Sequence, residues 1–104
     1  MHINDLSAKA YLNANSKGFW EDWEDTGYGR NNCISTRLML IVGEVAEAQE
    51  ALRKNDALNF REELADVAIR LADLCGGLGI DLEHEIEVKM IKNAQRPYKH
   101  GKLF

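Results

Sequence analysis

Two pairs of acidic residues are the part of this sequence most able to do chemistry. Glu44 and Glu47 form the first pair, and Glu63 and Asp66 form the second. Members of each pair are three residues apart, so in a helix their carboxylates project from one face, one turn apart. Each pair also flanks an apolar stripe. If the two helices pack antiparallel through these stripes, the four carboxylates converge.

Four converging carboxylates would need a cation beside them. Two unit charges about 4 Å apart repel by roughly 4 kcal/mol at an effective dielectric constant near 20, and a small domain has only about 5–15 kcal/mol of stability. Ligands that are all oxygen favour hard cations, so we expect Mg²⁺, with Mn²⁺ as a substitute. The alternative is that the acidic pairs are solvated helix faces, which 17 acidic residues in 104 make common.

A row of polar residues near the C-terminus has complementary chemistry. Lys89, Asn93 and Arg96 follow one another at steps of four and three, which places them on one face of a helix. Such a row can hold phosphate oxygens, with Arg able to do so bidentately. Alternatively, its cations only interact with the dipole at a helix end. Opposite an acidic cluster, the row indicates a site for a triphosphate–Mg²⁺ complex.

Several other residues allow two interpretations. Trp20 lies in an acidic, glycine-containing stretch, where we predict that it stacks on a nucleobase; the alternative is that it caps the core. Arg37 and Arg70 are expected to form ion pairs on the surface of the bundle. Cys33 and Cys75 have no zinc or disulfide spacing, and we expect both to fill small spaces in the core.

The elements that position these residues are predicted to be helices, about four in number, in an all-α bundle. Apolar residues alternate at steps of three and four, and runs of alternating β-branched residues are absent. A loop is expected over 19–32, and the pair Gly76-Gly77 is expected to end the third helix. Asn59 and Asp81 are the expected N-caps of the third and fourth helices. The helices are predicted over 4–17, 32–54, 59–77 and from 81 to before Pro97.

Length and charge limit the classes of protein that fit. A chain of 104 residues has room for one core, so we predict a single domain over 1–104. The net charge of −4 argues against nucleic-acid or anionic-membrane binding. No membrane span or signal peptide is visible, so a cytoplasmic location is expected. The chain is short and its second helix carries functional or apolar residues on two faces, so we expect self-association to complete the bundle.

In its two acidic pairs and its downstream polar row, the sequence resembles the MazG-like all-α nucleoside triphosphate pyrophosphohydrolases. The resemblance extends from about residue 32 to 102, and residues 17–20, Lys-Gly-Phe-Trp, look like the loop before the signature helix of phage and integron relatives. Arg70 is a departure, because relatives that read a pyrimidine carry an aromatic there, which argues against a pyrimidine-specific assignment. The ExxE…ExxD signature is matched by Glu44, Glu47, Glu63 and Asp66, and the downstream row by Lys89, Asn93 and Arg96.

The resemblance implies hydrolysis of ribo- or deoxyribonucleoside triphosphates to the monophosphate and pyrophosphate, a nucleotide-pool cleaning activity, with Mg²⁺ bound by the four acids. Glu44 and Glu47 are the expected catalytic residues, one of them orienting or deprotonating the attacking water. Lys89 and Asn93 would contact phosphates or sugar, with Arg96 in support. A homodimer or a dimer of dimers is implied. Two alternatives stay open: a phosphoribosyl-ATP pyrophosphohydrolase, and a non-catalytic helical dimerisation module.

Overall fold

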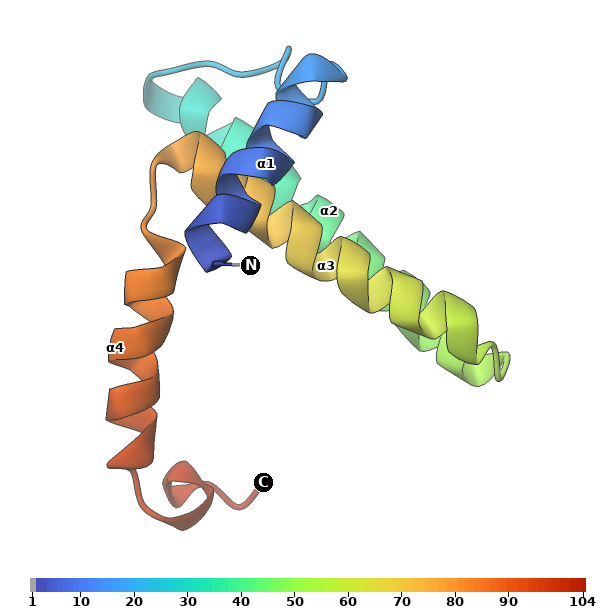
Figure 1. Cartoon of the computed structure of the whole chain (residues 1–104), viewed down its shortest axis with the longest axis vertical. Coiled ribbons are helices and arrows are strands. Elements are labelled where there is room, and N and C mark those ends of the chain that lie inside the picture. Colours follow the sequence, from blue (N-terminus) through green and yellow to red (C-terminus); the bar gives the residue numbers. More distant parts are fainter. Residues whose placement is uncertain (1) are drawn as a thin grey trace.

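The computed structural model describes residues 2–104, and every regular element in that range is helical (Figure 1). Four α-helices are followed by a short 3₁₀ helix, η1, which confirms the predicted all-α class and the expected number of helices. No strand occurs within the described residues. The elements are α1 (Ile3–Ser16), α2 (Gly27–Arg53), α3 (Ala57–Leu78), α4 (Leu82–Ala94) and η1 (Tyr98–Gly101).

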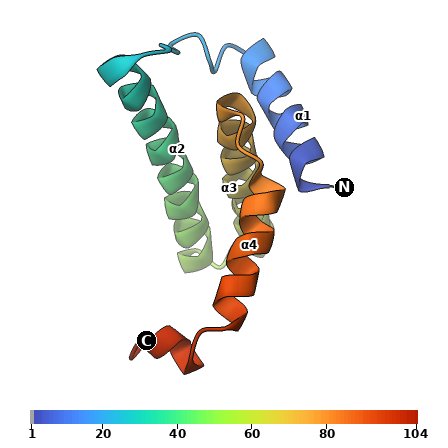
Figure 2. The ribbon, with the colours of Figure 1, turned by 90° about the vertical axis from the view of Figure 1, so that its left-hand side faces the viewer.

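Helix α3 is the centre of the arrangement, because α1 and α2 both pack against it (Figure 2). Helices α2 and α3 form a long antiparallel hairpin closed by a three-residue link over 54–56. Asn55 in this link has a φ of 58°, a left-handed conformation that Asn tolerates better than most residues. The antiparallel packing that the sequence analysis assumed is therefore present.

Helix α4 leaves this three-helix body after a tight turn and extends away from the α2–α3 hairpin (Figure 1). It is tied mainly to α1. Asn4 Nδ2 donates a hydrogen bond to Asp81 Oδ1 at 2.8 Å, and the backbone N–H of Ile3 donates to Glu83 Oε1 at 3.1 Å. Asp81 caps α4 as predicted, since its carboxylate accepts from the His84 N–H at 3.0 Å.

Two predicted starts of helices were wrong. Helix α2 begins at Gly27, five residues before the expected start, so only 17–26 remain as a connection. The preceding chain folds over the first turns of α2, where Cys33 Sγ donates to the Asp22 carbonyl at 3.1 Å. Helix α3 is capped by Asp56, which accepts from the Asn59 N–H at 3.1 Å, and not by Asn59.

The predicted end of α3 at Gly76-Gly77 was also wrong, because the helix continues to Leu78 and Gly79 terminates it with a φ of 69°. The two glycines have another purpose. A Cβ on Gly76 would lie 2.5 Å from the Ser7 carbonyl oxygen, and one on Gly77 would lie 2.2 Å from the Trp20 ring. Glycine is needed there for the close packing of α1 and of Trp20 against α3.

The core of the single chain is small. Its buried apolar residues are mostly small side chains, and no large side chain within residues 2–104 is fully buried. Many large apolar side chains on α2 and α4 remain exposed, among them Val42, Val45 and Ile91. Both free cysteines are buried, as expected. The buried apolar set comprises Ala10, Trp20, Cys33, Ala48, Ala51, Ala72, Leu74 and Cys75.

Candidate active site

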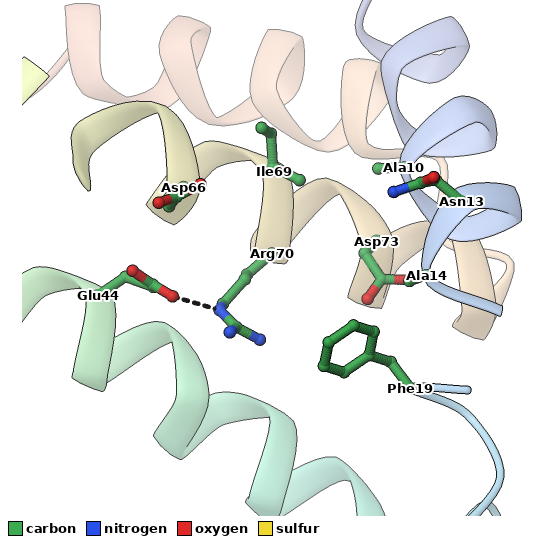
Figure 3. A pocket seen from close by; sticks show the side chains of 9 residues that line it. All are labelled: Ala10, Asn13, Ala14, Phe19, Glu44, Asp66, Ile69, Arg70 and Asp73. Carbon is green, nitrogen blue, oxygen red and sulfur yellow. Dashed lines mark hydrogen bonds and ion pairs between the residues drawn. The ribbon is translucent and has the colours of Figure 1, made fainter. Parts of the chain in front are cut away.

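Three of the four predicted metal ligands converge between α2 and α3. Glu44 comes from α2, and Glu63 and Asp66 come from α3. One carboxylate oxygen of each lies within 4.8 Å of the others. Figure 3 shows Glu44 and Asp66 on facing helices at one end of a cavity. The convergence follows from the spacing, because each acid flanks the seam through which the two helices pack.

Glu47 lies at the edge of this cluster. Its side chain is exposed, and the set of mutually close carboxylates does not include it. It is near enough to Glu63 to raise the pKa of that carboxyl group. The fourth predicted ligand therefore borders the cluster and faces solvent.

The three close carboxylates do not share one protonation behaviour. The neighbouring carboxylate of Glu44, together with burial and the nearby Glu47, raises the pKa of Glu63 to about 7. The pKa of Glu44 is instead lowered, chiefly because Arg70 donates a hydrogen bond to it, with Nε 2.7 Å from Oε1. The cluster thus contains one carboxylate kept ionised by a guanidinium and one that holds a proton near neutral pH.

Two buried oxygens of the cluster have no hydrogen-bond partner: Glu44 Oε2 and Glu63 Oε2. Leaving a buried acceptor without a partner costs about 1–3 kcal/mol, and more for a charged group. Carboxylate oxygens are the donor atoms that Mg²⁺ prefers, and these two belong to the residues that already lie within reach of one another. The residues present therefore fit a hard divalent cation.

Arg70 and Arg37 are both ion-paired, but neither pair is the ordinary surface contact that we expected. Arg70 neutralises part of the acidic cluster through Glu44. Arg37 is buried and binds Asp22, with Nη2 2.9 Å from Oδ1, and it donates to the Phe19 carbonyl at 3.0 Å. Arg37 therefore holds the 17–26 connection against α2.

A cavity of about 270 Å³ adjoins the acids (Figure 3). Glu44, Asp66 and Arg70 line one end, and Phe19 and Asp73 line the other. The remaining wall is formed by three residues of α1 and by Ile69. A phosphate-bearing ligand bound at the acids would thus have a partly apolar space next to it.

The structure places Trp20 in the core, as in the alternative interpretation, and not on a nucleotide-binding surface. Its side chain is 7% exposed, and its Nε1 donates to Asp73 Oδ1 at 2.8 Å. The Arg37 guanidinium covers the ring at 4.0 Å from its centroid. The aromatic that lines the cavity is its neighbour Phe19, which is 58% exposed. Of the two aromatics in the Lys-Gly-Phe-Trp segment, the structure therefore places Phe19 at the cavity and Trp20 in the core.

The row on α4 is not brought to the acids within one chain. The predicted helical row is only partly present, because α4 ends at Ala94 and Arg96 lies two residues beyond it. Lys89 and Arg96 are exposed, and Asn93 is half-buried, with an Oδ1 that has no hydrogen-bond partner. None of the residues that line the cavity comes from α4. Figures 1 and 2 show that the helix leads away from the hairpin that carries the acids.

Comparison with known families agrees with this geometry. The model of the MazG nucleotide pyrophosphohydrolase domain matches residues 34–100, well over half of the chain, and the protein belongs to this family. The matched region contains both acidic pairs and the row on α4. Searches of curated proteins and of solved structures each found no match. Within the described residues, no helix has the length and hydropathy needed to cross a membrane.

Proposed function

We propose that the protein hydrolyses nucleoside or deoxynucleoside triphosphates to the monophosphate and pyrophosphate in a Mg²⁺-dependent reaction, with Mn²⁺ as a substitute. One observation carries the proposal: Glu44, Glu63 and Asp66 converge beside a cavity, within the region that the nucleotide pyrophosphohydrolase domain matches. The acids account for the phosphate end of such a substrate, and the cavity has room for a further part of it.

In this proposal Glu44, Glu63 and Asp66 hold the cation, and Glu47 completes the set from its edge. Bound Mg²⁺ would neutralise charge on the phosphate oxygens and lower the pKa of a coordinated water. Glu44 suits a ligand because Arg70 keeps it ionised. Glu47 is exposed beside the cluster, so it is the better placed of the two predicted catalytic residues to orient the attacking water and accept its proton.

The proposal includes self-association, as a homodimer or a dimer of dimers. The single chain leaves large apolar side chains exposed on α2 and α4, with Val45 52% exposed and Ile91 63% exposed. Helix α4 also leads away from the hairpin that carries the acids of the same chain. A second copy packed on these faces would bury the apolar side chains and bring Lys89, Asn93 and Arg96 of one chain to the acids of the other.

The test is pyrophosphate release from the eight common nucleoside triphosphates, with and without Mg²⁺. We expect release with Mg²⁺ and none with a chelator. Phosphoribosyl-ATP belongs in the same panel, and exclusive turnover of that compound would replace the proposed substrate class. If nothing is hydrolysed and Mg²⁺ does not raise the melting temperature, the chain is a non-catalytic helical module, because a ligand that binds only the native state must stabilise it.

A further inference from the structure

The end of the cavity remote from the acids has a construction of its own. Phe19 and Ile69 supply apolar surface, and Ala10 and Ala14 of α1 leave space by their small size. The polar side chains at this end are Asn13 and Asp73 (Figure 3). The volume of about 270 Å³ is near the lower limit of ligand pockets, which is about 300 Å³. Such a space suits one flat ring system rather than a whole nucleotide.

Asp73 is held in a fixed orientation within this wall. Its Oδ1 accepts the Trp20 Nε1 hydrogen at 2.8 Å, and Trp20 itself is locked in the core. Burial raises the pKa of Asp73, while the Trp20 hydrogen bond and the charges of Arg37 and Arg70 oppose that rise. An ionised carboxylate has about four lone-pair sites for hydrogen bonds, and Trp20 fills one. The remaining sites can accept further N–H donors.

A group that only accepts hydrogen bonds discriminates among the bases. Guanine presents a ring N–H and an adjacent amino group on one edge, so it can donate to both carboxylate oxygens at once. Adenine and cytosine present an amino group next to a ring nitrogen that is itself an acceptor. Thymine and uracil present one N–H between two carbonyl oxygens, which a carboxylate repels. Asn13 can donate to the guanine carbonyl, and Phe19 offers a face for stacking.

We propose that Asp73, assisted by Asn13, reads the edge of the substrate base, and that the cavity selects guanine over thymine and uracil. The inference rests on the proposed function, because it places the phosphates of the same substrate at Glu44, Glu63 and Asp66. It adds a specificity-determining residue that lies outside the acidic signature, two turns along α3 from Asp66.

The decisive variant is Asp73→Asn. One oxygen remains to accept from Trp20, while the other acceptor becomes an amide donor that faces the guanine donors. A bidentate contact to a base gives a discrimination of roughly 5- to 150-fold, so the ratio of kcat/KM for dGTP to that for dTTP should fall by this factor. Asp25→Asn is the matched control, because Asp25 also accepts an indole hydrogen, from Trp23 at 2.7 Å, but does not line the cavity. The ratio of kcat/KM for dGTP to that for dTTP in Asp25→Asn should equal that of the wild type.

Binding of dGMP and dTMP, measured by calorimetry without metal, separates this inference from the proposed function. Tighter binding of dGMP that depends on Asp73 supports the inference even if no triphosphate is hydrolysed. Equal binding of the two monophosphates, or a dGTP to dTTP ratio unchanged in folded Asp73→Asn, overturns it and leaves pyrophosphohydrolysis standing. If Asp73→Asn does not fold, Asn13→Ala at an exposed position must lower the ratio by roughly 2- to 10-fold. No change in that variant also refutes the inference.

Discussion

The carboxylates of α2 and α3 are held against one another, whereas Lys89 lies on α4 and Arg96 lies just past its end, on a part of the chain that leads away from the hairpin. Glu44 and Glu63 have buried oxygens without partners, and Arg70 is the cation paired with the cluster. Lys89 and Arg96 are exposed, and neither takes part in an ion pair within residues 2–104. One half of the proposed site is thus preformed at an electrostatic cost, and the other half is unconstrained.

The difference has a physical origin in the packing of each region. The hairpin of α2 and α3 is fixed by a three-residue link and by contacts along its length. In the described residues, the hydrogen bonds between α4 and α1 join Asn4 and Ile3 to the start of α4. A metal site needs ligands at fixed separations, so it has to be built on the rigid hairpin. Groups that contact a substrate only after it has bound can come from an exposed helix or from another chain.

Asp66→Asn tests the preformed half and should have the largest effect. Loss of a ligand carboxylate should reduce Mg²⁺-dependent turnover by about a hundred- to a thousandfold, the range for removing a group that stabilises charge in the transition state. In the absence of metal, the variant should be as stable as the wild type or more stable, since one source of repulsion is gone.

Glu62→Gln is the matched control for that experiment, because Glu62 is an exposed acid on the same helix outside the cluster. It should keep normal turnover. Near-normal turnover of Asp66→Asn at saturating Mg²⁺ would show that Asp66 is not a ligand.

Mixing two impaired variants tests whether the two halves of the proposed site come from different chains. Arg96→Ala should lower kcat/KM by roughly 10- to 100-fold, the effect of losing a charged hydrogen bond to phosphate. If acids and row come from different subunits, a heterodimer of Arg96→Ala and Asp66→Asn contains one intact site. After equal mixing and exchange of subunits, roughly a quarter of the wild-type activity should return.

The control for mixing is the double variant, with both substitutions in one chain, mixed with wild type. In this heterodimer one site lacks Arg96 and the other lacks Asp66, so neither site is intact. No recovery in the first mixture, although light scattering shows a dimer, would place both halves of the site in one chain.

Arg70→Gln tests the guanidinium that pairs with Glu44 of the cluster. Without its guanidinium, the metal-free acids repel one another, and the free energy of unfolding should fall by about 1–3 kcal/mol. Saturating Mg²⁺ should restore most of that loss, because a divalent cation can replace the missing charge. Thermal melts with and without Mg²⁺ measure both effects. Arg61→Gln, at an exposed position on α3, should change neither the metal-free stability nor its response to Mg²⁺. An equal loss of stability in the two variants would show that Arg70 has no specific role at the cluster.

The sequence predicted the acidic site better than the rest of the molecule, and the reason is periodicity. Glu44, Glu63 and Asp66 converge because helical spacing and a shared seam determine which face each one occupies. The direction of α4 could not be predicted in this way, since it depends on the turn over 79–81 and on bonds to residues nearly eighty positions away.

The positions of the glycines and of the loop aromatics also depend on tertiary contacts that the sequence pattern does not show. Gly76 and Gly77 end a helix by local preference, but here they accommodate Ser7 and Trp20, which only tertiary structure brings near. In an irregular segment, adjacent residues do not follow a helical or strand repeat, so the sequence does not indicate which side chain faces the core. Phe19 and Trp20 therefore could not be told apart until Arg37 and Asp73 were seen around the indole.

The acidic cluster should also make the stability of the metal-free protein depend on pH, which is the smallest of the expected effects. The pKa of Glu63 is about 7 in the folded protein and near the ordinary value of 4.5 when unfolded. Between these values the native state holds a proton that the unfolded state has lost, so stability falls as pH rises from about 4.5 to about 7. Glu44 has a lowered pKa, so its contribution changes only below this window.

Comparing the wild type with Glu63→Gln isolates this contribution, because histidines that titrate in the same range are common to both proteins. Melting temperatures without metal should decline more steeply between pH 5 and pH 8 in the wild type than in the variant. Mg²⁺ requires the ionised form of Glu63, so its binding should release a proton below pH 7 and strengthen with rising pH, by about tenfold per unit for one proton. Saturating Mg²⁺ at pH 8 should therefore reverse the decline in the wild type. Parallel pH profiles of the two metal-free proteins would mean that Glu63 holds no proton near neutrality and that the carboxylates are farther apart in solution than the hairpin places them.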